Sequence, residues 1–132
     1  MAQEVKDWTD DYLIELKKYQ KKLGAVPFEN KVMRIDILSK QLVFIGKLAA
    51  EFSERYKRVY ATRKRTHAEA YIAATKNKAA VAELAVSDLR DEEAELYGSM
   101  KRWNNAFEST REEINALKYQ VRIDISDGSS RG

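Results

Sequence analysis

The chain contains no cysteine, and this absence excludes disulfide bonds and thiolate metal sites. A single histidine supplies too few imidazole ligands for a typical zinc site, and no Gly-rich phosphate loop or Ser-His-Asp set is present. We therefore expect no enzymatic activity, no metal and no cofactor. Long apolar runs are also missing, so no membrane contact is expected. The first residues lack an apolar core of the signal-peptide type, which favours a cytoplasmic location.

Residues that interrupt helices are scarce, with one proline and five glycines among 132 residues. Alanine, glutamate, lysine, leucine and arginine are abundant instead, as in long helices. The formal net charge is only +3, so the overall charge indicates little about partners. The distribution of charge along the chain is therefore more informative than its sum.

Apolar or small residues recur at alternating steps of three and four in two long stretches. This period of about 3.5 residues is typical of coiled coils. Thr75–Lys78 forms a polar break between the stretches, and Arg63 and Glu93 are the charged exceptions within them. We call these positions the seam: Ile35, Leu38, Leu42, Ile45, Ala49, Phe52, Tyr56, Val59, Arg63, Thr66, Ala70 and Ala73, then Ala82, Val86, Leu89, Glu93, Leu96, Met100, Trp103, Phe107, Thr110, Ile114, Leu117 and Val121.

The seam predicts an all-α fold in which two long helices form an antiparallel hairpin with a coiled-coil stalk. We expect one helical domain over residues 1–122, with helices at about 9–23, 31–75 and 79–122, and a disordered tail over 123–132. If the chain folds back at Asn77, residues whose numbers sum to about 153 face each other. Arg63 is then close enough to pair with Glu93, or to reach Asp88 or Glu92.

The short first helix is expected to pack at the base of the hairpin, against a second apolar stripe on the next helix. Thr9 and Asn30 are the expected N-caps of these two helices. The far half is expected to be a two-helix stalk with apolar groups on its flanks, which predicts self-association as a dimer or a ring of hairpins. The flanking residues are Tyr60, Tyr71, Ile72, Val81, Leu84 and Tyr97.

Four cations of the second helix, Lys57, Arg58, Lys64 and Arg65, occupy b and c positions one heptad apart. We call these four residues the basic ridge, and they are expected to point away from the third helix. Clustered cations bind phosphates by releasing counterions, and nearby aromatic rings stack on unpaired bases. The candidate nucleic-acid-binding residues are therefore Lys57, Arg58, Arg63, Lys64, Arg65, Tyr60 and Tyr71.

Two other interpretations of the Lys/Arg-rich segment that contains the basic ridge remain open. Its cations can pair with the third helix, because residues 79–99 hold six acids and one arginine, or they can simply be solvated. The acidic residues from Asp91 to Glu95 are not expected to form a catalytic carboxylate pair, because consecutive helical residues point in different directions.

Residues 30–121 resemble the small phage recombination mediators of the UvsY type. The similarity lies in size, in the all-helical arrangement, in the opening of the second helix with Asn30-Lys31-Val32-Met33, and in the Lys/Arg-rich segment from Arg55 to Arg65. The acidic run from Asp88 to Glu95 departs from the pattern.

This resemblance implies a phage DNA recombination or replication accessory protein in the host cell cytoplasm. Such a protein acts as a homo-oligomer, binds single-stranded DNA, and helps to load a recombinase onto strands covered by single-strand-binding protein. The alternative is a non-enzymatic adaptor or inhibitor that docks a protein partner through its charged stalk.

Overall fold

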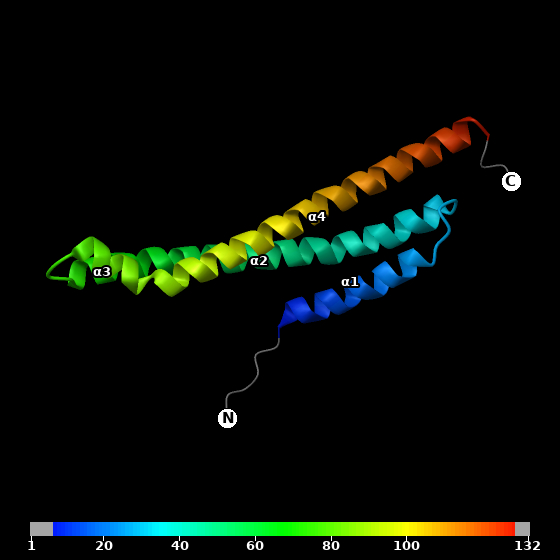
Figure 1. Ribbon diagram of the computed structural model, residues 1–132. Coiled ribbons are helices and arrows are strands. Elements are labelled where there is room, and N and C mark those ends of the chain that lie inside the picture. Colours follow the sequence, from blue (N-terminus) through cyan, green and yellow to red (C-terminus); the bar gives the residue numbers. More distant parts are fainter. Residues whose placement is uncertain (1–6, 129–132) are drawn as a thin grey trace, which may run out of the picture. The chain divides into compact units, whose positions relative to one another are not determined.

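A computed structural model describes residues 7–128 of the chain (Figure 1). Four helices account for the regular structure in this range: α1 (Trp8–Gly24), α2 (Lys31–Ala73), α3 (Lys78–Ala85) and α4 (Ser87–Ser126). The predicted all-α class is confirmed. Between residues 7 and 128, no helix combines the length and the apolar character needed to cross a membrane.

Of the two predicted N-caps, Asn30 is confirmed and Thr9 is wrong. Asn30 caps α2, because its Oδ1 accepts a hydrogen bond of 3.2 Å from the backbone N–H of Met33. Thr9 is not the cap of α1. Asp7 takes that role, and its Oδ1 accepts from both the backbone N–H (3.0 Å) and the hydroxyl (2.6 Å) of Thr9. A carboxylate that accepts two such bonds is the stronger cap.

The third predicted helix begins where expected, but it differs from the structure by a break near its beginning and at its C-terminal end. It is interrupted at Val86, whose backbone (φ −111°, ψ 10°) separates α3 from α4. It also continues to Ser126, so the expected tail is helical over its first four residues, while residues 129–132 lie outside the described range. The Lys31 Nζ lies 2.6 Å from the Asp124 Oδ2, and this ion pair holds the last turns of α4 against α2.

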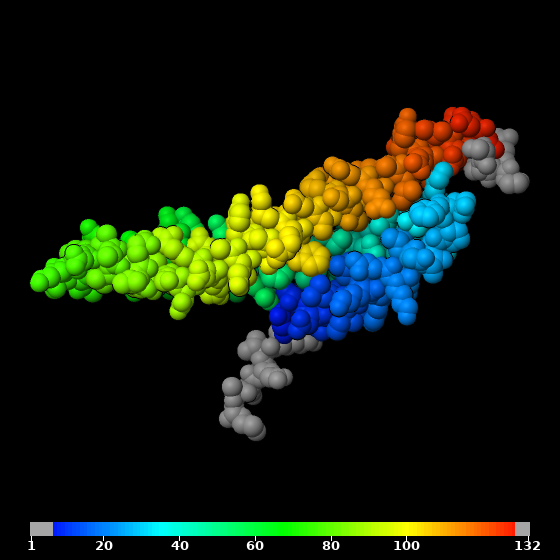
Figure 2. Space-filling view, in the orientation of Figure 1, coloured from blue at the N-terminus to red at the C-terminus, as the bar shows by residue number. Residues whose placement is uncertain are grey.

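The helices divide into two compact units. Unit 1 contains α1, α2 as far as Leu48, and α4 from Trp103 onward. In this unit α1 packs along α2, as Figure 2 shows in blue and cyan, and the Phe44 ring lies 6.3 Å from the Tyr12 ring and 6.0 Å from the Tyr19 ring. The short helix therefore packs on the second helix as predicted. The buried aliphatic core of unit 1 consists of Leu16, Ile37, Leu38, Ile45, Leu48 and Ile114.

Unit 2 contains α2 from Ala49, all of α3, and α4 as far as Arg102. Its core is thin, because the buried apolar side chains are only Ala49, Ala82 and Val86, and the remaining seam residues are half-buried except for Ala73, which is exposed. Most seam side chains of unit 2 are thus covered on one side only, as the sequence predicted. All six flanking apolar residues named above are exposed.

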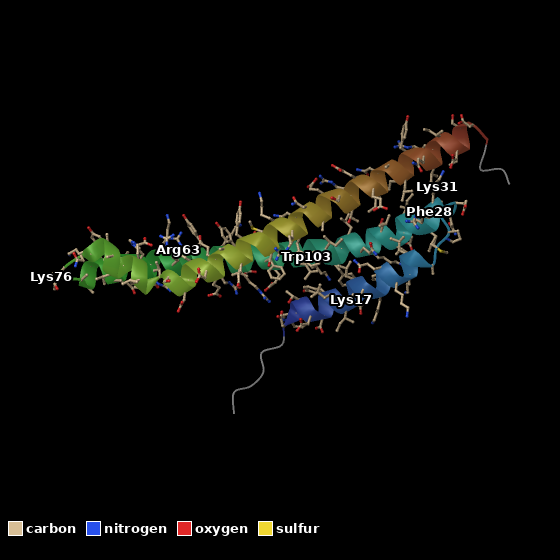
Figure 3. All side chains as sticks on the ribbon, viewed as in Figure 1. Lys17, Phe28, Lys31, Arg63, Lys76 and Trp103 are labelled. Carbon is tan, nitrogen blue, oxygen red and sulfur yellow. The ribbon has the colours of Figure 1, made fainter. Side chains whose placement is uncertain are left out.

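The predicted register is confirmed within each unit. In unit 1 the Phe107 ring lies beside Gly46, where a Cβ atom would stand 3.3 Å from the ring. In unit 2 the rings of Tyr56 and Tyr97 are 5.4 Å apart. Helix α2 thus packs antiparallel to α4, and every seam position except the exposed Ala73 is buried or half-buried. The turn after α2 includes Lys76, labelled in Figure 3, and Asn77, which has a left-handed backbone (φ 50°).

Candidate nucleic-acid interface

The basic ridge lies on the exposed surface of α2 in unit 2, as its b and c positions predict. Arg58 forms an ion pair with Glu54, one turn earlier on the same exposed face. Lys57, Lys64 and Arg65 form no ion pair with any residue between 7 and 128. Three of the four ridge cations are therefore available to bind an anion.

Arg63 differs from the ridge, although the sequence placed it in the same candidate set. Its guanidinium forms a two-point ion pair with the Glu93 carboxylate of α4, through Nε and through Nη2 at 3.4 Å. The Arg63 side chain is only 13% exposed, and its hydrogen bond to Glu93 raises the pKa of the guanidinium. Of the three acidic partners considered for Arg63, the structure thus selects Glu93. Arg63 joins α2 to α4 and is not a fully exposed cation.

Tyrosine rings lie among these cations. The Lys64 Nζ is 5.0 Å from the centroid of the Tyr60 ring, and the Arg63 guanidinium carbon is 5.3 Å from it. Such distances are typical of cation–π contacts. Tyr71, the other tyrosine in the candidate set, lies toward the α2–α3 turn and contacts Lys78, whose Nζ is 5.6 Å from the ring centroid.

Tyr97 of α4 belongs to the same aromatic cluster, and sequence reasoning identified it only as an exposed flank residue. Its ring lies 5.4 Å from the Tyr56 ring, and the Tyr56 ring lies 6.3 Å from the Tyr60 ring. The Lys101 Nζ also approaches Tyr97, at 5.6 Å from the ring centroid. The signal was present in the sequence, because Tyr56 and Tyr97 are partners in the predicted register.

A cavity of about 290 Å³ opens beside this cluster. We call it the aromatic pocket. It lies between α2 and α4, within unit 2, and is open to solvent. Its lining residues are Tyr56, Arg90, Glu93, Ala94 and Tyr97.

A second cavity of about 300 Å³ lies in the same unit and is lined by Arg63, Lys64, His67 and Arg90. We call it the basic pocket, because each of its lining residues is an arginine, a lysine or a histidine. Arg90 lines both pockets, so the two cavities are neighbours. Sequence reasoning did not identify Arg90, because it lies within the acidic run of the third predicted helix.

Glu83 of α3 fixes two side chains of the basic pocket. Its carboxylate accepts two hydrogen bonds of 2.9 Å from Arg90, through Nε and Nη2, and its Oε1 lies 3.3 Å from the His67 Nε2. The hydrogen bond from Arg90, and to a smaller extent His67, lower the pKa of Glu83. Glu83 is therefore ionised at neutral pH and orients the guanidinium of Arg90. The same contact spans the break at Val86 that separates α3 from α4.

Three residues of the acidic run of α4 lie on a different side of the helix from the pocket residues Arg90 and Tyr97. Asp88, Glu92 and Glu95 follow one another at steps of four and three, and are exposed. Arg90 and Tyr97, which line the pockets, are each offset from this stripe by two residues, or about 200° around the helix. Of the acidic run, which departed from the mediator pattern, only Glu93 lines the aromatic pocket, and its carboxylate is paired with Arg63.

Comparison with known proteins adds no relative to this description. The chain matches no protein-family model, no curated protein and no solved structure. In the range 7–128, no group of three or more histidine, aspartate or glutamate side chains is placed to hold a metal ion.

Proposed function

We propose that this protein binds single-stranded DNA through unit 2. The observation that supports this function best is the combination of exposed, unpaired ridge cations with neighbouring tyrosine rings on α2. Lys64 illustrates it, because its ammonium group is exposed, contacts the Tyr60 ring, and forms no ion pair with residues 7–128. Cations of this kind gain affinity by releasing counterions from phosphates, and tyrosine rings stack on bases of any sequence.

The resemblance to phage recombination mediators extends this proposal. In that role the protein is a non-catalytic accessory factor that presents the strand to a recombinase in the presence of single-strand-binding protein. It acts as an oligomer, because several weak ridges that bind one strand together reach a higher avidity than one ridge alone.

Self-association through unit 2 is supported by its incomplete core. Ile72 and Leu84 are 77% and 78% exposed, respectively, and Tyr71 and Val81 on the same flanks are also exposed. Large exposed apolar groups mark interaction surfaces in soluble proteins. A second copy of this chain would cover them and would also cover the half-buried seam, so a four-helix arrangement of two copies is the simplest assembly.

The test is a charge reversal of the basic ridge, with Lys57, Arg58, Lys64 and Arg65 all replaced by glutamate. Binding of a labelled oligo-dT strand, followed by fluorescence anisotropy across a salt titration, is expected to weaken on the order of 100-fold or more, with a salt slope smaller by about 3. Light scattering on the same samples reports whether the oligomer is retained.

A matched control carries the same change of charge in unit 1. It replaces the exposed residues Lys17, Lys21, Lys118 and Arg122 by glutamate. This control is expected to retain most of the oligo-dT affinity, because its cations are distant in sequence from the ridge. Wild-type protein that fails to bind oligo-dT at low salt, or equal losses in the two variants, would contradict the proposed site.

The alternative is an adaptor that docks a protein partner, and one observation favours it. Asp88, Asp91, Glu92 and Glu95 of α4 are exposed and form no ion pair with residues 7–128. This stripe is complementary to a basic protein surface. Under this alternative, lysine or glutamine substitutions in the acidic stripe abolish partner binding, whereas reversal of the basic ridge leaves that binding intact.

A further inference from the structure

We propose that the aromatic pocket and the basic pocket together bind one nucleotide of a single strand, with the base in the former and its phosphate in the latter. This inference rests on the proposed function and makes it more specific. It extends the interface from α2 to α4, and it assigns binding roles to Tyr97 and Arg90, which lie outside the basic ridge.

The aromatic pocket has the size and the walls that suit a planar base. Its volume of about 290 Å³ lies at the lower end of the range of about 300–1,000 Å³ known for ligand pockets, so it suits a small ligand. The Tyr97 side chain is 44% exposed, and its ring is tilted by 53° from that of Tyr56. The ring of Tyr97 is therefore accessible for stacking by an incoming base.

The basic pocket keeps hydrogen-bond donors that its internal ion pairs do not use. Arg63 and Arg90 each pair with a carboxylate through Nε and Nη2, so the Nη1 group of each guanidinium has no partner among residues 7–128. The Lys64 Nζ also forms no ion pair in that range. A phosphate oxygen in the pocket can accept from these groups, which are charge-assisted donors.

The charge of the site favours an anion. Its permanent cations are Arg63, Lys64 and Arg90, and the carboxylates that contact them are Glu83 and Glu93. Three positive charges against two negative charges leave a positive surplus, and a phosphate in a DNA strand brings one negative charge. The two glutamates also hold Arg63 and Arg90 in place, so little side-chain freedom is lost when a phosphate binds.

The two pockets are neighbours because Arg90 lines both of them. A base and its own phosphate are joined through one sugar, and such a unit spans two adjacent cavities. A base within a duplex is paired and stacked, and would have to be extruded before it entered the aromatic pocket. The site therefore selects single strands over duplexes.

The decisive experiment uses two strands of equal length and charge. One is oligo-dT, and the other carries an abasic sugar analogue at every position. Wild-type protein is expected to bind oligo-dT on the order of 10-fold more tightly than the abasic strand, because base stacking adds to the phosphate contacts. A matched duplex is expected to bind more weakly than oligo-dT.

Three variants test which residues produce the preference for oligo-dT over the abasic strand. Tyr97→Ala is expected to remove most of the advantage of oligo-dT and to leave the abasic strand bound as before. Ala94→Leu fills the aromatic pocket from an exposed position of α4, removes no contact, and is expected to have the same effect. Lys64→Gln is expected to weaken binding of both strands and to reduce the salt slope by about 1. Tyr119→Ala, at a 60% exposed position of α4 in unit 1, is the matched control and is expected to change neither affinity.

The outcomes separate the nucleotide site from the proposed function. Equal binding of oligo-dT and the abasic strand by wild-type protein overturns the nucleotide site and leaves DNA binding in place. An unchanged preference in Ala94→Leu, with helicity confirmed by circular dichroism, also overturns it. If wild-type protein binds neither strand, the proposed function is overturned along with the site.

Discussion

Gln41 of α2 provides the sharpest test of how the core of unit 1 is built. The residue is only 5% exposed, and its Nε2 has no hydrogen-bond partner among residues 7–128. Its neighbours on α2, including Leu38 and Ile45, are buried and aliphatic. A buried amide donor without a partner forfeits the hydrogen bonds that it makes to water in the unfolded chain.

The substitution Gln41→Met keeps the length of the side chain and removes the polar group. An unsatisfied buried donor costs about 1–3 kcal/mol, so we expect the free energy of unfolding of unit 1 to rise by about that amount. For a chain of this size each kcal/mol corresponds to roughly 3–5 °C, so the expected rise in Tm is between about 3 and about 15 °C.

The assay is urea unfolding followed by tryptophan fluorescence. Both tryptophans, Trp8 and Trp103, belong to unit 1, so the signal reports the unit that contains Gln41. Gln120→Met makes the same chemical change at an exposed position of α4. It is expected to change the free energy of unfolding by no more than an ordinary surface substitution does, about ±0.5 kcal/mol. A Gln41→Met variant that is less stable than wild type would refute the reasoning, because it would show that the amide is hydrogen-bonded in the assembled protein.

Two further predictions concern unit 2. Asn77 has a left-handed backbone in the turn after α2, so Asn77→Gly is expected to leave the stability of the protein nearly unchanged. Asn77→Ala is expected to lower the free energy of unfolding by about 1 kcal/mol, measured by thermal unfolding. Equal stability of the two variants would contradict the left-handed turn. Because Arg90 lowers the pKa of Glu83 in the folded state, the stabilising contact is present above about pH 4.5, the ordinary pKa of this carboxyl, and is lost as the pH falls through the lowered pKa. Arg90→Gln is expected to flatten this acid dependence of unfolding, measured by circular dichroism, whereas Arg102→Gln, which removes a hydrogen bond to Ser99 alone, is not.

Much of the fold followed from the periodicity of the seam. A repeat of 3.5 residues specifies which side of each helix is buried, and the polar break specifies where the chain turns back. The register therefore implies that Tyr56 and Tyr97 are partners, and it gave Glu93 as one of three acids within reach of Arg63, from which the structure selects Glu93. The ends of the helices were less predictable. A cap depends on local hydrogen-bond competition, and for this reason Asp7 replaced Thr9.

The candidate site was only partly predictable. Heptad positions placed the basic ridge in solvent correctly, because b and c positions point away from the partner helix. Heptad positions alone did not show that Arg90 and Tyr97 of α4 lie close to the ridge on α2. That proximity depends on how the two helices cross and on the direction in which each side chain projects. A charge count over residues 79–99 averages Arg90 with six acids and hides that Asp88, Glu92 and Glu95 lie on a different side of α4 from Arg90.

The sequence by itself thus determined the helical class, the antiparallel register, and the exposure of the ridge, since these depend on period and on local polarity. Only the tertiary structure decided the break at Val86, the division into two compact units, and the two neighbouring pockets joined by Arg90. The two pockets arise from contacts between residues far apart in the chain. The packing of α2 against α3 and α4 brings those residues together, with the ion pair of Arg63 and Glu93 and the contact of His67 with Glu83.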